Sequence, residues 1–364
     1  MVPSQLIYNV TRVAPYGVSM TGEVQLIERI RRRIPSRAGA GRGDALRIGI
    51  GDDAAVLRAG RRVEWVLTCD AFLENVHFLA RAHPPDVVGF KALARATSDL
   101  AAMGAVPRFF LLSMALPASR TGEWLNGFLT GLARAARRFK LVLAGGDTAK
   151  HPMVAISVTV LGEVKRGRAI TRSGARPGDL LYVTGRLGSA QLGLELILRG
   201  MHREGRWRRL LRPHLYPQPR LNVGQWLARR RLASAMLDTS DGLSTDLRHL
   251  CRASGVGARL WADRIPMVRV PKGLRERGFN ALELALHGGE DYELLFTVPR
   301  RLRRWVPRSR RATLITHIGE IVRRRDVVLV GPDGRDTALP ARGWDHFRPS
   351  RAGRVTLDIK GRGT

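Results

Sequence analysis

The sequence predicts a mixed α/β or α+β fold in two domains. Its 364 residues exceed the length of one typical domain. Segments with strand-like and helix-like patterns alternate along the chain, and glycine–acid loops follow several of the apolar segments. The apolar share of 44% is ordinary for a globular protein. No apolar run approaches the roughly 18 residues of a membrane span, so we expect no membrane association.

The expected elements follow the chain in two sets separated near residues 165–172, where Gly and Pro interrupt the pattern. For the first set we predict helices over 22–34, 86–103 and 121–139, and strands over 45–50, 63–69, 108–117, 141–146 and 153–164. For the second set we predict strands over 180–184, 234–237 and 292–298, and helices over 189–199, 243–253 and 281–286. The expected domains are a loose N-terminal extension over 1–20, a first domain over 21–168, a second over 169–350 and a tail over 351–364.

The charge of the chain is strongly basic, with a formal net charge of +31. Six lysines and 56 arginines supply the cations, and the arginine clusters are scattered along the sequence. A nucleic-acid-binding protein would favour one continuous basic face with stacking aromatics, but aromatic residues make up only 6%. We therefore interpret the charge as a basic surface that binds nucleic acid at most non-specifically. The first twenty residues lack a signal-peptide pattern, and two cysteines allow no disulfide framework, so we expect a cytoplasmic protein.

Carboxylates stand beside apolar segments at five places in the chain. They are Asp52 and Asp53, Asp70 after Thr68 and Cys69, Asp99, Asp147 after Gly145 and Gly146, and Asp238 and Asp241 around Ser240. Taken singly, most of these residues could be turn formers or helix caps. Asp99 differs, because a carboxylate on an alanine-rich helix must be paired or bind a metal if it is buried. Together the five places predict one site for a hard cation, and oxygen ligands of this kind suit Mg²⁺.

Two glycine-rich segments predict contacts to an anion. Two glycines before Asp147 would let backbone N–H groups approach a phosphate closely. The segment "HGGEDYELLFTV" at 287–298 repeats the pattern before another strand, with Glu290 and Asp291 after its glycines. The alternative for each segment is a tight turn next to a buried strand.

The motifs "GIGDDAAVL", "LTCDAFLENVHF", "ALARATSDLAAMGAVP", "AGGDTAK", "ITRSGARPGDLLYVTG", "LDTSDGLSTDL", "HGGEDYELLFTVP" and "GWDHF" occur in the order found in the thiamine-monophosphate kinase family. The chain resembles that family over about residues 20–347. The resemblance implies an aminoimidazole-ribonucleotide-synthetase-like fold, with a homodimer formed by the N-terminal sheets and a C-terminal α/β domain. It also implies transfer of the γ-phosphoryl group of ATP to thiamine monophosphate, with Mg²⁺ as cofactor. Because the acceptor is a phosphate oxygen, the reaction needs alignment and charge neutralisation more than a strong base.

The resemblance also implies roles for individual residues. The implied magnesium ligands are Asp53, Thr68, Asp70, Asp99, Asp238 and Asp241, and the implied catalytic carboxylates are Asp241 and Asp147. The implied nucleotide contacts are Gly146, Asp147, Arg172 and Ser240, and the implied thiamine monophosphate contacts are His77, Glu290 and Trp344. Asp52 is left open between a ligand and a turn residue. An indole such as Trp344 suits a cationic thiazolium ring.

The sequence departs from the family pattern at Cys69, where a hydroxyl residue is usual, and at Ala149, where Thr is common. Two other classes of protein are alternatives. Another ATP-using enzyme of the same superfamily, of the purine-synthesis or maturation type, would lack "NVHF" and "GWDHF" or would carry a reactive cysteine near a terminus. A nucleic-acid-binding protein is the less favoured alternative.

Overall fold

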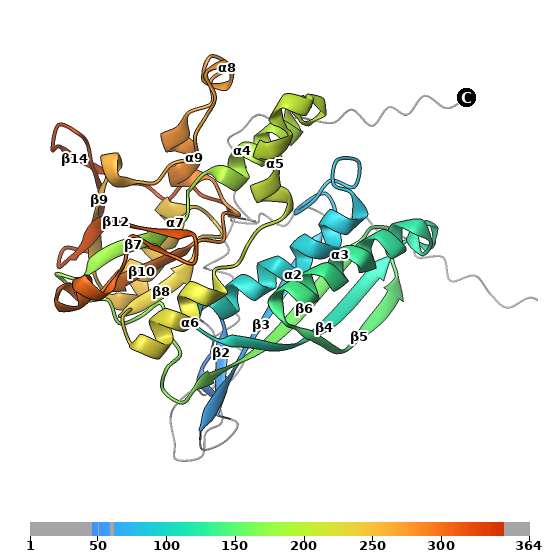
Figure 1. Cartoon of the computed structure of the whole chain (residues 1–364), viewed down its shortest axis with the longest axis horizontal. Helices are drawn as coiled ribbons and strands as arrows, with labels where there is room; N and C mark the ends of the chain where they lie inside the picture. The colour runs from blue at the N-terminus through green and yellow to red at the C-terminus, as the bar shows by residue number, and fades with distance from the viewer. Residues whose placement is uncertain (1–45, 50, 59–61, 346–364) are drawn as a thin grey trace, which may run out of the picture. The chain divides into compact units, whose positions relative to one another are not determined.

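The computed structural model describes residues 46–49, 51–58 and 62–345. All of these except Asp345 belong to one compact unit, Ser36–Trp344. The helix expected over 22–34, the expected extension over 1–20 and the expected tail over 351–364 lie outside the described residues. The mixed α/β prediction is confirmed, because two sheets with packed helices follow one another along the chain (Figure 1).

The first sheet has six strands in the order β1-β2-β3-β6-β4-β5. Their bounds are β1 Leu46–Ile48, β2 Ala55–Arg58, β3 Val63–Leu73, β4 Val106–Leu116, β5 Val142–Lys150 and β6 Ala155–Lys165. Neighbouring strands are antiparallel, except that β4 and β5 are parallel. Two helices, α2 (Pro85–Ala102) and α3 (Glu123–Phe139), pack against each other, and α2 contacts β3, β4 and β6 (Figure 1).

The two faces of this sheet differ because side chains alternate along each strand. Val66 and Phe72 of β3 belong to a buried core with residues of α2 and α3. On the opposite face, Trp65 lies 6.1 Å from Phe109, measured between ring centroids. Phe109 and Leu111 of β4 are each 40% exposed on that face. We call this second face the open face, because within the described residues no helix packs on it.

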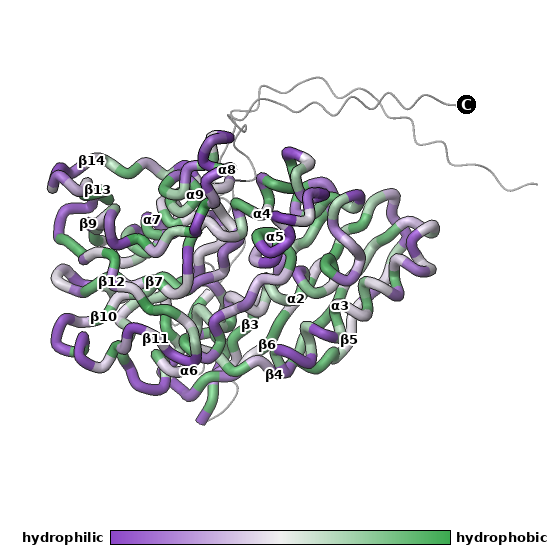
Figure 2. Tube along the Cα trace, turned by 45° about the horizontal axis from the view of Figure 1, so that its top comes forward, coloured by the Kyte–Doolittle hydropathy of each residue, from purple (hydrophilic) through white to green (hydrophobic). Residues whose placement is uncertain are grey.

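The second sheet follows the order β14-β13-β9-β12-β7-β10-β8, with β11 paired to β12. Its strands are β7 Leu180–Thr184, β8 Ala235–Asp238, β9 Gly257–Trp261, β10 Leu294–Val298, β11 Ser309–Arg310, β12 Thr313–Val322, β13 Val327–Val330 and β14 Asp336–Ala338. The helices of this half are α4 Ser189–Leu198, α5 Arg208–Leu215, α6 Leu221–Arg230, α7 Leu243–Ser254, α8 Lys272–Arg275 and α9 Ala281–His287. Hydrophilic loops lie at the outer ends of this sheet (Figure 2).

The C-terminal end of α2 joins the two halves. Ala101 and Ala102 are fully buried in a core that also contains Trp226 of α6 and Met236 of β8. Gly224 of α6 allows this contact, because a Cβ atom there would lie 2.0 Å from the carbonyl oxygen of Ala101. The close packing brings the last turn of α2 next to the end of β8.

Most of the predicted elements are confirmed, but two predicted strand ends are wrong. The strand expected to end at 69 continues to Leu73, since β3 pairs with β6 over its whole length. The strand expected to end at 146 continues to Lys150 beside β4, so Gly146 and Asp147 lie inside an edge strand. In both cases cross-strand pairing extends the strand through residues that locally favour a turn. None of the described helices has the length and apolar character required to cross a bilayer.

Candidate active site

Three of the predicted metal ligands meet where the two halves join. Asp53 precedes β2, Asp99 lies in the last turn of α2, and Asp238 ends β8. One carboxylate oxygen of each lies within 4.8 Å of the others. The Thr68 hydroxyl of β3 donates a 2.7 Å hydrogen bond to Oδ2 of Asp99. We call Asp53, Asp99 and Asp238 the carboxylate cluster.

The carboxylate cluster holds like charges in a buried place. Burial raises the pKa of Asp99 well above its usual value, and the charges of Asp70, Asp238 and Asp53 raise it further. Burial, followed by the charge of Asp53, raises the pKa of Asp238 to about 7. Such a group of acids is unfavourable unless protons or a cation neutralise it.

The cluster fits a hard divalent cation. Oδ2 of Asp53 and Oδ2 of Asp238 are both buried, and neither has a hydrogen-bond partner within the described part of the chain. Buried carboxylate oxygens without partners are rare in native proteins and indicate an ion or a water at that place. An all-oxygen donor set favours Mg²⁺ over softer metals. Asp70 lies near enough to affect the pKa of both Asp99 and Asp238.

Arg172 and Asp52 hold the loop that carries Asp53. Nη2 of Arg172 donates a 2.8 Å hydrogen bond to Oδ1 of Asp53. The backbone N–H of Arg172 donates to Oδ1 of Asp52 at 3.0 Å. Asp52 therefore holds the turn against the backbone of Arg172. The guanidinium of Arg172 thus lies beside Asp53 of the carboxylate cluster. The contact between Arg172 and ATP stays a prediction.

The residues predicted around Asp241 lie close together. Asp238 ends β8, and the loop after it carries Ser240 and Asp241. The backbone N–H of Trp344 donates to the carbonyl oxygen of Asp241 at 2.9 Å. Trp344 is 51% exposed. Nδ1 of His77 accepts a 3.0 Å hydrogen bond from the backbone N–H of Leu73, which anchors that ring at the end of β3.

Gly146 and Asp147 lie apart from the carboxylate cluster within one chain. Asp147 pairs with Ser113 of β4, in the same alternation as Phe109 and Leu111, so its side chain lies on the open face. Thr68 lies on the other face of the sheet, toward α2. β5 is also three strand positions from β3, which is roughly 14 Å at the usual strand spacing. The single chain therefore does not bring Asp147 to the cluster.

Glu290 is bound by a lysine and a histidine that sequence reasoning missed. Its Oε2 lies 2.7 Å from Nζ of Lys91 and 3.0 Å from Nδ1 of His214. Burial opposes ionisation of Glu290, but Lys91 and His214 outweigh it and hold its pKa well below the usual value. Lys91 did carry a signal, since a lysine on an apolar helix stands out in a chain with only six lysines.

Arg95 is a third missed residue. Its guanidinium lies 5.2 Å from the centre of the Phe72 ring. Its Nε and Nη1 atoms are buried, and neither has a hydrogen-bond partner among the residues with described positions. Arg95 precedes Asp99 by one helical turn, so it adds a cation on the α2 face that carries the cluster.

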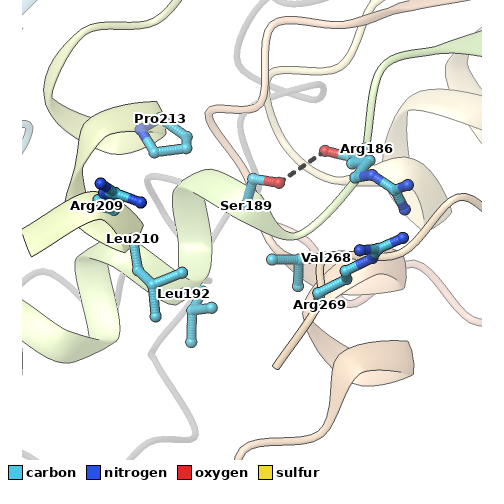
Figure 3. Close-up of a pocket in the computed structure, with 8 residues that line it drawn as sticks. All are labelled: Arg186, Ser189, Leu192, Arg209, Leu210, Pro213, Val268 and Arg269. Atoms are coloured by element: carbon cyan, nitrogen blue, oxygen red, sulfur yellow. Dashed lines mark hydrogen bonds between the residues drawn. The ribbon is translucent and has the colours of Figure 1, made fainter. Parts of the chain in front are cut away.

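A cavity of about 360 Å³ lies beside the start of α4 (Figure 3). Arg186, Arg209 and Arg269 line it, over an apolar floor that includes Leu192 and Val268. Figure 3 shows Arg186 and Arg269 on one side and Arg209 on the other. None of the predicted site residues lines this cavity, so it is separate from the residues assembled above.

Two family models match the chain. The N-terminal domain of AIR synthase related proteins matches residues 51–164, and their C-terminal domain matches residues 176–331. The thiamine-monophosphate kinase of Salmonella typhimurium is 37% identical over 330 residues, which cover 90% of this chain and 98% of that protein. The thiamine-monophosphate kinase of Bacillus subtilis is 34% identical and covers 83% of this chain and 94% of its own length.

Solved structures give the same result. A structure described as AaThiL complexed with AMPPCP and TMP has a TM-score of 0.77 and 34% identity, covering 90% of this chain and 97% of that one. A hydrogenase maturation protein HypE in complex with ATP has a TM-score of 0.63 at 19% identity, which is a likeness of fold. The chain belongs to the AIR synthase related proteins and, among them, to the thiamine-monophosphate kinase family.

Proposed function

We propose that this protein transfers the γ-phosphoryl group of ATP to thiamine monophosphate, giving thiamine diphosphate and ADP. The observation that carries the proposal is the carboxylate cluster at the junction of the two halves. Relatives named thiamine-monophosphate kinase match nearly the whole chain, and a similar structure holds AMPPCP and TMP. Both findings support ATP and thiamine monophosphate as the substrates.

The residues present suit phosphoryl transfer between two anions. Asp53, Asp99 and Asp238 would hold Mg²⁺, with Thr68 fixing the orientation of Asp99. Bound Mg²⁺ would supply neutralisation of the charge on the transferred phosphoryl oxygens. We assign Asp70 and Asp241 to the same ligand set, since both lie beside cluster residues in the chain or in space.

The two substrates are assigned to different residues around the cluster. Arg172 is assigned to an ATP phosphate, and the hydrogen bond from its guanidinium to Asp53 supports this role. Ser240 is assigned to the nucleotide on the resemblance alone. Trp344 is assigned to the thiazolium ring of thiamine monophosphate, and its exposure next to Asp241 supports this role. His77 is assigned to the same substrate on the family resemblance. Glu290, for which the resemblance implies the same contact, is already bound by Lys91 and His214.

We further propose a homodimer in which the open faces of two copies pack together. This face carries Trp65, Phe109, Leu111 and Val142, and large apolar side chains left exposed on a sheet favour a partner surface. A second copy is the occupant proposed here, because Asp147 and Gly146 lie on or beside this face and need a second chain to approach any nucleotide site. The two cysteines are free, which supports a reducing cytoplasm.

The test is an assay of the purified full chain with ATP, Mg²⁺ and thiamine monophosphate, following thiamine diphosphate by chromatography. We expect one thiamine diphosphate per ADP and no product when EDTA replaces Mg²⁺. ATP consumption on another acceptor, with no thiamine diphosphate formed, would contradict the proposed substrate. Thiamine, which lacks the acceptor phosphate, serves as the control substrate and should not react.

A further inference from the structure

We propose that Lys91, Glu290 and His214 form a clamp that positions the carboxylate cluster for metal binding. The clamp would act through the backbone and would not touch the metal or either substrate. The inference rests on the proposed metal site, and it assigns Glu290 to positioning in place of the substrate contact that the resemblance implies.

The clamp connects three separate parts of the chain. Lys91 lies on α2, His214 lies on α5, and Glu290 lies in the loop between α9 and β10. Lys91 Nζ and His214 Nδ1 lie 2.7 Å and 3.0 Å from the same oxygen of Glu290. His214 continues the network, because its Nε2 lies 3.0 Å from Nε2 of His83. Lys91 and His214 side chains are each only 1% exposed.

The loop that carries Glu290 has a strained backbone. Glu290 and Tyr292 have φ angles of 65° and 50°, which side chains other than glycine rarely adopt. Such conformations persist only where the surroundings hold them, and they gather at functional sites. Asp291, between them, accepts hydrogen bonds from the backbone N–H groups of Gly188 and Ala190 at the start of α4. The start of α4 therefore holds this loop in place.

Hydrogen bonds transmit the position of this loop to the cluster. The backbone N–H of Glu290 donates to the carbonyl oxygen of Ser240 at 2.8 Å, and that of Tyr292 donates to the carbonyl oxygen of Thr239 at 2.9 Å. Thr239 directly follows the cluster residue Asp238. On the other side, Lys91 lies eight residues before Asp99 on the same helix, which is about 12 Å along the axis. The Lys91–Glu290 pair thus connects α2, which carries Asp99, to the loop that follows Asp238 at the end of β8.

A positioning role explains why a buried lysine is present. A buried ion pair contributes little net stability compared with apolar side chains of the same size, because both ions lose their hydration. It does specify one arrangement of the parts it joins, since each charge needs the other. The cluster needs such an arrangement, because its carboxylates repel one another wherever neither protons nor a cation neutralise them.

The experiment measures Mn²⁺ binding by titration calorimetry on the metal-stripped full chain without nucleotide. The variants are Lys91→Met, Glu290→Gln and the two together, with Lys272→Met as a matched control on the surface. We expect at least a tenfold loss of Mn²⁺ affinity in the three clamp variants and none in the control. Simple electrostatics predicts the reverse for Lys91→Met, because removing a cation should tighten binding of Mn²⁺.

The double variant separates positioning from stability. It removes both buried charges, so thermal unfolding in EDTA should recover toward wild type while Mn²⁺ affinity stays low. Recovery of both the thermal stability and the Mn²⁺ affinity would mean that the Lys91–Glu290 pair has only a structural role, and would overturn the clamp. Wild-type Mn²⁺ affinity in Lys91→Met, or a loss confined to the KM for thiamine monophosphate in Glu290→Gln, would overturn the clamp.

Two His214 variants decide the matter if the charge variants fail to fold. Asn places a nitrogen near the position of Nδ1, so His214→Asn can keep the bond to Glu290, whereas His214→Gln keeps only the outer contact toward His83. We expect near wild-type Mn²⁺ affinity in the first and a tenfold loss in the second. Equal affinities would overturn the proposal. A wild-type chain that binds Mn²⁺ but does not phosphorylate thiamine monophosphate would refute only the proposed substrate.

Discussion

Replacing Asp238 by Asn should stabilise the metal-free protein and weaken its response to Mg²⁺. Asp238 is 4% exposed, and burial together with Asp53 raises its pKa from 3.8 to about 7. In the unfolded chain the carboxyl ionises near its ordinary pKa, so between pH 4 and pH 7 the folded state binds the extra proton. Stability is therefore lost as the pH rises through this window.

The size of the effect follows from the pKa difference. A shift of about 3 units corresponds to about 4 kcal/mol at pH 8, at 1.36 kcal/mol per unit, and to less than half of that at pH 5. Asn has the same shape without the charge. Asp238→Asn should therefore raise the free energy of unfolding in EDTA by up to about 4 kcal/mol at pH 8 and by clearly less at pH 5.

Chemical denaturation in EDTA at both pH values, repeated with saturating Mg²⁺, measures these differences. Mg²⁺ at 100 times its dissociation constant should stabilise the wild type by about 2.7 kcal/mol and the variant by much less. Asp336→Asn, at an exposed ion pair, is the matched control and should stay within about 0.5 kcal/mol. A destabilised Asp238→Asn in EDTA, or equal Mg²⁺ stabilisation of both proteins, would refute the account of the cluster.

Three further predictions concern activity and assembly. Asp241→Asn should lower kcat by about 10²-fold or more with an unchanged melting curve, because it removes a carboxylate that would help hold the cation that neutralises the phosphoryl oxygens; near-full activity would exclude Asp241 from the site. Trp344→Ala should raise the KM for thiamine monophosphate about threefold to tenfold through loss of a cation–π contact, and an effect on the KM for ATP alone would contradict stacking. Leu111→Glu should give a monomer by light scattering, since it places a charge on the open face, whereas Leu198→Glu on α4 should keep the wild-type mass. A Leu111→Glu protein that remains dimeric would place the interface elsewhere.

Local patterns determined the kinds of element and the chemistry of the site. An alanine-rich segment with stop signals after it predicted α2 with Asp99 on it, and the aspartates at the ends of apolar segments predicted a hard-cation site. These features are readable because each depends on neighbours in the chain. The order of eight motifs was specific enough to indicate the family, which the comparisons confirm.

Tertiary structure decided which of these residues meet. The close packing of α2 on α6 at Gly224 brings Asp99 to Asp238, two residues far apart in the sequence. Pairing of β4 with β5 carries Asp147 onto the open face, although its local pattern matches that of the other aspartates. Lys91 and Glu290 are 199 positions apart, and the local sequence around either residue does not indicate that the two side chains meet. The sequence by itself therefore determined the donor residues and their chemistry. Packing and strand pairing decided which of these donors lie together, because burial and charge repulsion act between segments that are distant in the sequence.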